Sequence, residues 1–311
     1  MTASPRHSPT PSPVAWPDGF VSLDGGSLRV HPDCVDAFAT RGWDTLGAVM
    51  RDDTVERFRG RAFRDNCRLT LATAAGPVEA YLKRHRIDSA RLHRSECRAL
   101  PAGQSPAEAE ASAVWRCRQA GVPSLTVLAV GTRSYGPRRS DSFFLSAALA
   151  GCVPASELFA SQAESDSVAV DRPGRQHAAM VAIGRLAGRL HRAGLVHHDL
   201  YLEHFFLDTA RLIASDGLAN AAFLIDLQRI ERRPVWQPPL KDLGQIYGSC
   251  AAQPAAATLW DVFLRHYDNP EVAEPGEPSA ATRLRAAAAA QRWNVRIARR
   301  RLLQRWRRRA A

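Results

Sequence analysis

Apolar and polar residues alternate along residues 61–86, which include the segment CRLTLATAAGPVEAYLKRHR. Alternation with a period of two predicts half-buried strands, and the Gly-Pro pair at 76–77 predicts a turn between two of them. We therefore expect a hairpin that places Lys83 at the end of its second strand. Two short apolar runs, 124–131 and 142–149, are separated by a basic turn and predict two further strands.

A helix is predicted between the hairpin and these later strands. Ser105 is a good N-cap, Pro106 is tolerated at the first helical position, and Glu108 follows three residues after the serine, as in a capping box. Glycine often ends helices because it adopts the left-handed conformation at little cost, so we expect this helix to stop at Gly121.

The chain after about residue 152 is predicted to be mainly helical. Apolar residues at helical spacing in QHAAMVAIGRLAGRLHRAG predict a helix that ends at Gly194. A sheet-rich lobe followed by a larger helical lobe is an α+β, two-lobed architecture. Further helices are expected at 240–267 and 281–309, with short apolar runs at 203–207 and 222–227.

These patterns divide the chain into four parts. The Pro- and Ser-rich residues 1–19 are expected to be a disordered lead. The expected bounds of the other parts are 20–149 for the N-terminal lobe, 150–280 for the C-terminal helical lobe and 281–311 for a basic helical tail. A short helix is expected within 36–50, ahead of the core of the first lobe.

The composition narrows the class of protein. No stretch of 18 or more apolar residues occurs, and the N-terminus lacks the apolar core of a signal peptide, so we expect a cytoplasmic protein. The six cysteines are scattered without a CxxC pair, which argues against a disulfide framework and against a zinc ribbon.

Lysine is almost absent from the basic residues. Of the 42 Lys and Arg residues, 40 are Arg, and only Lys83 and Lys241 are Lys. One explanation is that geometry at these positions demands the compact point charge of lysine on its slim stem. The other is that base composition removed most lysines and these two survived by chance.

The net charge of +11 belongs to the C-terminal end of the chain. The segment from Arg283 onward holds 11 Arg and no acidic residue, which leaves the rest near neutral. With Trp293 and Trp306 among its arginines, the tail 283–309 fits a helix that lies on an anionic membrane surface, here the inner face of the cytoplasmic membrane. A last helix packed on the large lobe fits as well. No recognised nucleic-acid module accompanies the tail, so no specific nucleic acid is expected.

Two aspartates stand in the segments with the strongest chemical signal. Asp199 lies within LHRAGLVHHDLYLEHFFLD at 190–208, and Asp226 lies between two apolar residues in FLIDLQRI at 223–230. Phosphoryl transfer needs one carboxylate to orient the attacking hydroxyl and another to hold magnesium against the phosphates. An unpaired buried carboxylate is costly, so an Asp226 buried among apolar neighbours is expected to have a function.

These segments resemble the lipopolysaccharide core kinases, the bacterial heptose and Kdo kinases that are related to protein kinases. The catalytic-loop pattern of that family is H-x-D-x-Y-x-x-H-x-x-L, and His197, Asp199, Tyr201, His204 and Leu207 match all five positions. The resemblance covers about residues 50–270 and includes YLKRHR upstream. It implies a two-lobed protein-kinase-like fold and an ATP-dependent kinase.

The resemblance also implies the roles of the residues in the second lobe. Asp199 is expected to be the catalytic base that receives the proton of a sugar hydroxyl. Asp226 and His204 are expected to hold Mg²⁺, although Leu-Gln follows Asp226 where protein kinases have Phe-Gly. His198 replaces an arginine that pairs with a phosphorylated activation loop in many protein kinases, which argues against that form of switching.

In the first lobe the resemblance assigns Lys83 to the α- and β-phosphates of ATP. Glu110 lies 11 residues before Gly121, the spacing expected for the glutamate that pairs with this lysine, and Glu108 is its competitor. No G-x-G-x-x-G precedes the lysine, so the segment 60–68 is the best candidate for the loop that covers the phosphates. Adenine is expected to bind backbone groups in the hinge, around Ala147 and Leu149.

The sequence therefore predicts a kinase that uses ATP and Mg²⁺ to phosphorylate a sugar hydroxyl of lipopolysaccharide core or a similar glycolipid. A protein or small-molecule acceptor on the same fold is one alternative. A catalytically inactive, membrane-associated scaffold is another, which the missing glycine loop favours and the intact Lys83, Asp199 and Asp226 oppose. The clustered histidines also suggest zinc, but no cysteine lies near them; they are His191, His197, His198 and His204.

Overall fold

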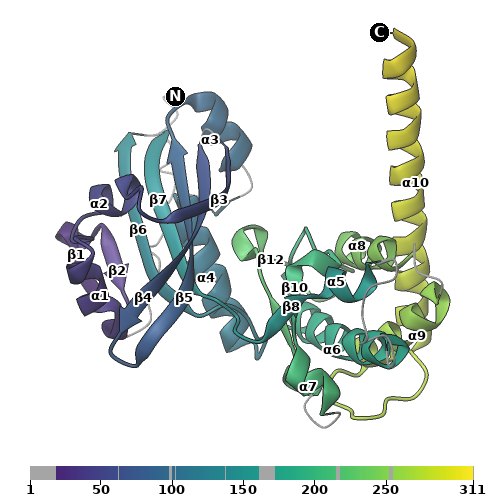
Figure 1. Cartoon of the computed structure of the whole chain (residues 1–311). Helices are drawn as coiled ribbons and strands as arrows, with labels where there is room; N and C mark the ends of the chain where they lie inside the picture. Colours follow the sequence, from purple (N-terminus) through teal and green to yellow (C-terminus); the bar gives the residue numbers. More distant parts are fainter. Residues whose placement is uncertain are drawn as a thin grey trace, which may run out of the picture. The chain divides into compact units, whose positions relative to one another are not determined.

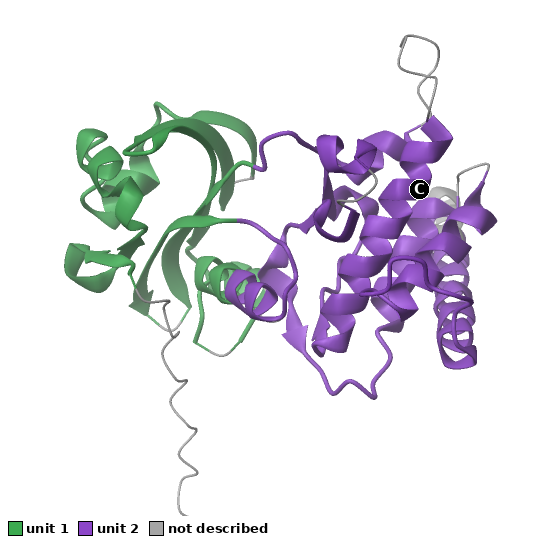
Figure 2. Ribbon diagram, turned by 90° about the horizontal axis from the view of Figure 1, so that it is seen from below, with its two compact units in different colours: residues 1–112, 126–148 green, residues 113–125, 149–311 purple. Residues whose placement is uncertain are grey.

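The chain forms two compact units, which Figures 1 and 2 show. Unit 1 comprises residues 1–112 and 126–148, and unit 2 comprises residues 113–125 and 149–311. This division concerns compactness alone, and the four-part domain organisation stays a prediction. The computed structural model describes residues 19–61, 63–97, 100–101, 103–136, 138–160, 172–214, 218–251 and 255–310, so residues 1–18 of the expected lead lie outside it.

A seven-stranded antiparallel sheet forms the centre of unit 1, with the strand order β1-β2-β6-β7-β5-β4-β3. The predicted hairpin is confirmed as β4 and β5, which pair from Thr73 opposite Gly76. The strands are β1 (Val21–Leu23), β2 (Leu28–Val30), β3 (Glu56–Arg61), β4 (Arg64–Thr73), β5 (Gly76–Ile87), β6 (Val127–Gly136) and β7 (Arg139–Ala147).

Lys83 lies inside β5 rather than at its end, which corrects the prediction. The strand continues for four more residues, to Ile87, because partners remain on both sides. Lys83 faces Asn66 across to β4 and Phe144 across to β7. A lysine in the middle of a central strand has a fixed backbone, which suits a residue that must hold a charge in place.

The N-terminal segment adds more than the one short helix that we expected. It contributes β1 and β2 to the sheet, together with two helices, α1 (Val35–Thr40) and α2 (Leu46–Arg51). Phe38, Trp43 and Leu46 are fully or almost fully buried and belong to the same apolar cluster as strands β4 to β7. Strands of three residues are too short to show a period of two, so the sequence pattern could not reveal them.

Helix α4 (Pro106–Gln119) begins as the sequence predicts. The Ser105 hydroxyl accepts a hydrogen bond from the Glu108 N–H, and the Glu108 carboxylate accepts one from the Ser105 N–H. Residues 87–104, for which the polar sequence predicts no regular element, contain a further helix, α3 (Ala90–Glu96). Its N-cap is Ser89, whose hydroxyl accepts from the Leu92 N–H.

Unit 2 is mainly helical, as predicted, with two small sheets. Strands β8 (Cys152–Pro154), β10 (Phe205–Asp208) and β11 (Ala222–Leu224) form one sheet, and β9 (Leu195–Val196) pairs with β12 (Glu231–Arg232) in the other. The helices are α5 (Ala155–Phe159), α6 (Arg172–Arg192), α7 (Thr209–Ile213), α8 (Leu240–Cys250), α9 (Ala256–Asp268) and α10 (Ala280–Ala310).

The predicted helix over 240–267 is in fact two helices, α8 and α9. Both are amphipathic and share the same apolar period, which is why the pattern reads as one element. The predicted tail helix over 281–309 is confirmed as α10. Along the described helices, none combines the length and apolarity that a membrane-spanning helix requires.

Helix α6 is the buried centre of unit 2, and two glycines bring it close to α9. A Cβ on Gly184 would lie 2.7 Å from the Phe263 carbonyl oxygen, and one on Gly188 would lie 2.5 Å from the Tyr267 carbonyl oxygen. Real Cβ atoms do not approach backbone oxygen so closely, so the two helices can pack at this distance only with glycine.

Replacing Gly188 by alanine should therefore destabilise the protein, because α9 would have to move away from α6. We expect Gly188→Ala to lower the free energy of unfolding by about 1–3 kcal/mol in urea denaturation. Gly276→Ala is the matched control, since a Cβ there meets no atom within 4 Å. The control should change the free energy by less than about 0.5 kcal/mol. Equal stabilities for the two variants would contradict this account of the packing.

Candidate active site

The loop that carries Asp199 starts at the end of α6. Gly194 ends the helix with φ of 69°, a left-handed conformation that favours glycine, and a Cβ there would lie 2.8 Å from the Arg233 carbonyl oxygen. The Gly194 carbonyl accepts a hydrogen bond from the Arg233 N–H at 2.7 Å. This close approach aligns β9 with β12, and the loop follows β9 directly.

Asp242 on α8 holds the backbone of this loop. Its two carboxylate oxygens accept hydrogen bonds from the N–H groups of His197 at 2.7 Å and His198 at 2.8 Å, and His191 Nε2 lies 3.2 Å away. Asp242 is fully buried. Burial alone would raise the pKa of its carboxyl, but the hydrogen bonds that Asp242 accepts from His191 and from the His197 backbone outweigh burial and hold the pKa below its ordinary value.

His197 links the two aspartate-bearing segments. Its Nδ1 accepts a hydrogen bond from the Asp199 N–H at 3.3 Å, and its Nε2–H donates to the Ile225 carbonyl at 3.0 Å. These partners define one neutral tautomer, and complete burial lowers the pKa of the imidazole in agreement with it. The distance between the two aspartate-bearing segments therefore depends on an uncharged His197.

Asp199 lies among three polar side chains that sequence reasoning missed. Arg229 Nη1 is 2.8 Å from Oδ2, while Lys241 Nζ and Gln245 Nε2 are 3.8 Å and 3.5 Å from Oδ1. The scarcity of lysine was a signal for Lys241. Arg229 is one of 40 arginines and gave no signal, and Gln245 meets the loop only because α8 folds onto it.

His204 and Asp226 face each other on the far side of the Asp199 backbone. His204 Nδ1 donates to the Asp199 carbonyl at 2.5 Å, which leaves Nε2 pointing at Asp226 Oδ2, 3.7 Å away. Asp226 follows β11 in a left-handed conformation with φ of 55°. Such strained non-glycine conformations cluster at functional sites.

The expected burial of Asp226 is wrong. Its neighbours Leu224 and Leu227 are fully buried, but the Asp226 side chain is 35% exposed. The left-handed backbone turns this carboxylate outward from the apolar layer on either side of it. Within the described residues no three His, Cys, Asp or Glu side chains are grouped to hold a metal ion, so Asp226 and His204 could supply two ligands at most.

In unit 1 the structure pairs Lys83 with Glu110. Lys83 Nζ lies 2.5 Å from Glu110 Oε1, the glutamate is fully buried, and the lysine side chain is 16% exposed. The competitor Glu108 instead caps its own helix through Ser105. A lysine held by a buried carboxylate from a neighbouring helix presents a fixed positive charge, as binding of a phosphate requires.

The remaining predicted positions lie at or just beyond strand ends, with segment 60–68 and Ala147 in unit 1 and Leu149 in unit 2. Segment 60–68 spans the end of β3 and the start of β4, the hairpin that precedes the strand of Lys83. Ala147 is the last residue of β7, and its N–H donates to the Thr126 carbonyl. The Leu149 carbonyl accepts from the Cys152 N–H at 3.2 Å.

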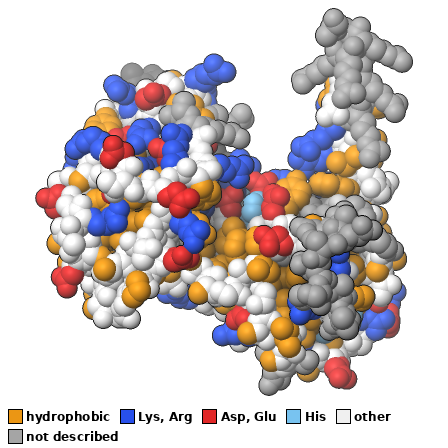
Figure 3. Space-filling model, in the orientation of Figure 1, with side chains coloured by type: hydrophobic (Ala, Val, Ile, Leu, Met, Phe, Trp, Pro, Cys, Tyr) orange, Lys and Arg blue, Asp and Glu red, His pale blue; other side chains and the backbone are white. Residues whose placement is uncertain are grey.

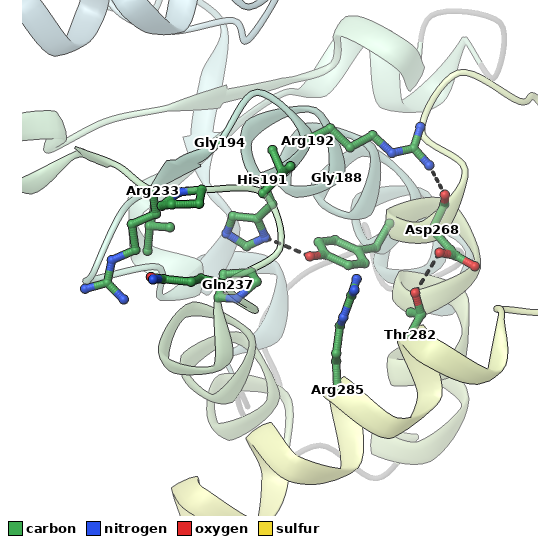
Figure 4. A pocket seen from close by; sticks show the side chains of 14 residues that line it. Gly188, His191, Arg192, Gly194, Arg233, Gln237, Asp268, Thr282 and Arg285 are labelled. Carbon is green, nitrogen blue, oxygen red and sulfur yellow. Dashed lines mark hydrogen bonds between the residues drawn. The ribbon is translucent and has the colours of Figure 1, made fainter.

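A pocket of about 230 Å³ adjoins His191, and Figure 4 shows the side chains that line it. It is lined by residues of α6, α9, α10 and the segment before α8, and His191 Nδ1 bonds there to the Tyr267 hydroxyl at 3.0 Å. None of the predicted site residues lines this pocket. His191 lines the pocket and also lies 3.2 Å from Asp242 Oδ2.

A sheet unit with a buried lysine–glutamate pair and a helical unit with this aspartate-bearing loop define a phosphotransferase of the protein-kinase-like class. The lipopolysaccharide kinase (Kdo/WaaP) family model matches residues 53–267. The chain is 31% identical over 204 residues to the lipopolysaccharide core heptose(I) kinase WaaP of Pseudomonas aeruginosa, which is 63% of this chain and 72% of that protein. The chain therefore belongs to the Kdo/WaaP lipopolysaccharide kinase family.

A solved structure of WaaP in complex with acyl carrier protein resembles the chain with a TM-score of 0.52 at 25% identity. The likeness covers 74% of this chain and 85% of that one. The family and the kinase-like α+β fold that the catalytic-loop pattern predicted are thus confirmed.

The hydrogen bonds from the loop backbone to the Asp242 carboxylate predict that the stability of the fold depends on pH. The pKa of its carboxyl is lowered in the folded state, so its contribution is complete above the ordinary value of 3.8 and is lost as the pH falls through the folded value. We expect Asp242→Asn to lose about 3 kcal/mol of unfolding free energy at pH 7, because the amide cannot accept from both N–H groups.

Urea denaturation of wild type and variant between pH 7 and pH 3 tests this expectation, and the difference between the two should shrink as the pH falls below 3.8. Asp261→Asn is the control, since Asp261 forms an exposed pair with Arg265 on α9 and should contribute less than about 1 kcal/mol. A difference between wild type and Asp242→Asn that stays constant down to pH 3 would refute the proposed role of the charge.

Proposed function

We propose that the protein transfers the γ-phosphate of ATP, with Mg²⁺, to a sugar hydroxyl of lipopolysaccharide core or a similar glycolipid. The observation that carries this proposal is the placement of Asp199, whose backbone is fixed by His197 and His204 and whose carboxylate lies among Arg229, Lys241 and Gln245. The related WaaP is by name a lipopolysaccharide core heptose kinase, and this supports the choice of acceptor.

Asp199 would orient the acceptor hydroxyl and take its proton. Its side chain is 29% exposed, so an acceptor can reach it, and its Oδ2 lies 2.8 Å from Arg229 Nη1. Phosphoryl transfer asks little covalent chemistry of a protein, and positioning with charge stabilisation supplies most of the rate. Arg229 would therefore have to release Oδ2, or share it, when the hydroxyl arrives.

Asp226 and His204 would hold the magnesium ion. Their facing atoms, Oδ2 and Nε2, are 3.7 Å apart, and His204 Nδ1–H is used by the Asp199 carbonyl, so the Nε2 lone pair is directed at the same space as the carboxylate. Mg²⁺ commonly takes one or two protein ligands and completes its shell with phosphate oxygens and water. When bound, the ion would neutralise charge on the transferred phosphoryl group.

Lys83 would contact the α- and β-phosphates of ATP, with Glu110 fixing its ammonium group. Support comes from the 2.5 Å pair and from the rigid position of Lys83 inside β5. The hairpin of β3 and β4 would cover the phosphates with basic side chains where protein kinases use glycines. Adenine would bind near Ala147 and Leu149; because the Ala147 N–H already donates to Thr126, this contact would fall to Leu149.

The distal part of α10 would contact an anionic membrane at the inner face of the cytoplasmic membrane. Val295, Leu302 and Leu303 are 50–64% exposed on this helix among arginines, and basic side chains gather on its described part (Figure 3). Its proximal part packs on α8 and α9, so with a membrane contact at its distal part α10 would combine the two arrangements that the sequence left open.

Asp199→Asn should abolish catalysis without abolishing nucleotide binding, because the amide cannot take a proton. We expect kcat to fall roughly 10³-fold, while calorimetry gives a dissociation constant for MgATP within about twofold of wild type. The rate is measured as transfer from labelled ATP to purified core glycolipid, with a peptide and a free sugar as alternative acceptors. Asp261→Asn, with its exposed carboxylate on α9, is the control and should keep full activity.

Full activity in Asp199→Asn would overturn the proposed mechanism. Labelling of peptides alone would overturn the proposed acceptor. If wild type failed to bind nucleotide with Mg²⁺, the inactive-scaffold alternative would be supported.

Neutralising the exposed arginines of α10 should weaken its contact with lipid. Arg292, Arg299 and Arg300 are exposed, and each basic residue near an anionic surface contributes about 1 kcal/mol. We expect the triple Arg→Gln variant to bind vesicles with anionic lipid at least tenfold more weakly than wild type in a co-sedimentation assay. Equal binding of wild type to anionic and zwitterionic vesicles would refute the membrane contact.

A further inference from the structure

Helix α10 lies outside the residues 53–267 that the family model matches, yet it packs on the helix that holds the catalytic loop. Two glycines of α8 make this contact possible. A Cβ on Gly244 would lie 3.0 Å from the Ala289 carbonyl oxygen, and one on Gly248 would lie 2.0–2.4 Å from atoms of the Trp293 ring. The Trp293 indole thus covers the Gly248 backbone with no side chain between them.

From Gly248 the Trp293 ring extends to the catalytic loop. It meets Tyr201 edge to face, with ring centroids 6.1 Å apart, and Tyr201 in turn meets His204 with centroids 6.4 Å apart. Tyr201 and Trp293 are both partly exposed. A row of aromatic rings therefore leads from α10 to the residues proposed to act on the phosphate, and solvent reaches two of the rings.

Positive charge accompanies these rings. The Arg296 guanidinium carbon lies 5.9 Å from the centre of the Trp293 ring. Lys241 Nζ lies 3.8 Å from Asp199 Oδ1. Burial lowers the pKa of Lys241, and the nearby positive charge of Arg296 lowers it further. Among the described residues Arg296 has no carboxylate within 4 Å, so its charge is available to a ligand.

We propose that Tyr201, Trp293, Arg296 and Lys241 form an acceptor subsite that binds a sugar ring bearing an anionic group, a phosphate or a carboxylate. The C–H face of a sugar ring packs on aromatic surface because both are apolar, while its hydroxyls stay at the edge. The anionic group then pairs with the two cations. Bound in this way, the sugar places a hydroxyl beside Asp199, two residues from Tyr201 in the chain. The subsite rests on the proposed function, and it specifies which acceptors that function uses.

Trp293 could also serve only to anchor α10 on α8, and kinetics separate the two roles. A ring that binds acceptor affects the acceptor KM and leaves MgATP binding unchanged. A ring that only anchors the helix affects thermal stability and spares the acceptor KM once the variant is folded. Trp293→Phe keeps a flat ring at this position and Trp293→Leu does not, so the pair distinguishes a stacking surface from simple apolar packing.

The experiment measures initial rates with the full-length protein and detergent-solubilised core glycolipid, so that attraction to a membrane does not contribute. For Trp293→Leu we expect the acceptor KM to rise three- to tenfold at unchanged MgATP affinity, with Trp293→Phe closer to wild type. Gly248→Ala should reproduce the effect of Trp293→Leu, because the new Cβ displaces the intact indole from its position over α8.

The charge is tested with Arg296→Ala and with Arg285→Ala, a control arginine 11 residues earlier on the same helix that lines the pocket beside His191 instead. Arg296→Ala should raise the KM of a phosphorylated or carboxylated acceptor three- to tenfold and leave that of a neutral acceptor unchanged. Comparing phosphorylated with carboxylated acceptors identifies the anion that the subsite prefers. Arg285→Ala should match wild type with every acceptor.

The subsite is overturned if the folded Trp293→Leu and Arg296→Ala variants show the wild-type acceptor KM. It is also overturned if Arg285→Ala raises the KM as much as Arg296→Ala, since the helix would then act through its total charge. Both results presuppose that wild type phosphorylates the glycolipid. A wild type that transfers no phosphate contradicts the proposed function itself and is distinguished by that measurement alone.

Discussion

The hydrogen bonds of the buried Asp242 carboxylate are the interaction on which the candidate active site of unit 2 depends. The carboxylate accepts hydrogen bonds from the consecutive N–H groups of His197 and His198, and so fixes the backbone directly before Asp199. Because Asp242 belongs to α8, the loop takes its position from that helix. The same helix places Gln245 against the Leu200 N–H and the His198 carbonyl, and its glycines receive α10. One helix of 11 residues thereby positions the catalytic loop on one side and the C-terminal helix on the other.

Both lysines of the chain lie beside a carboxylate at a position proposed for phosphate chemistry. Lys83 contacts the buried Glu110 in unit 1, and Lys241 lies close to Asp199 in unit 2. A slim stem with a compact charge fits such partly buried positions better than the broad fork of arginine. Of the two explanations for the scarcity of lysine, geometry therefore agrees better with the structure than chance survival does.

The sequence patterns predicted those parts of the fold that depend on residues close together in the chain. The hairpin of β4 and β5 and the capping box of α4 follow from alternation and from N-cap chemistry, and the catalytic-loop pattern placed Asp199 and His204 together. The strands β1, β2, β8, β9 and β12 have two or three residues and leave no periodic pattern. The contacts of Asp199 with Arg229, Lys241 and Gln245 arise only when α8 packs on the loop. The exposure of Asp226 depends on a left-handed backbone that its apolar neighbours do not reveal.

We propose that this member of the Kdo/WaaP family phosphorylates a sugar hydroxyl at the expense of ATP. The most direct test is to incubate the wild-type protein with ATP, Mg²⁺ and purified core glycolipid, and to examine the product by phosphorus NMR and mass spectrometry. We expect one new phosphomonoester on a core sugar, with one ADP released for each phosphate transferred. Release of ADP with no phosphate on the glycolipid, or no release of ADP, would contradict it.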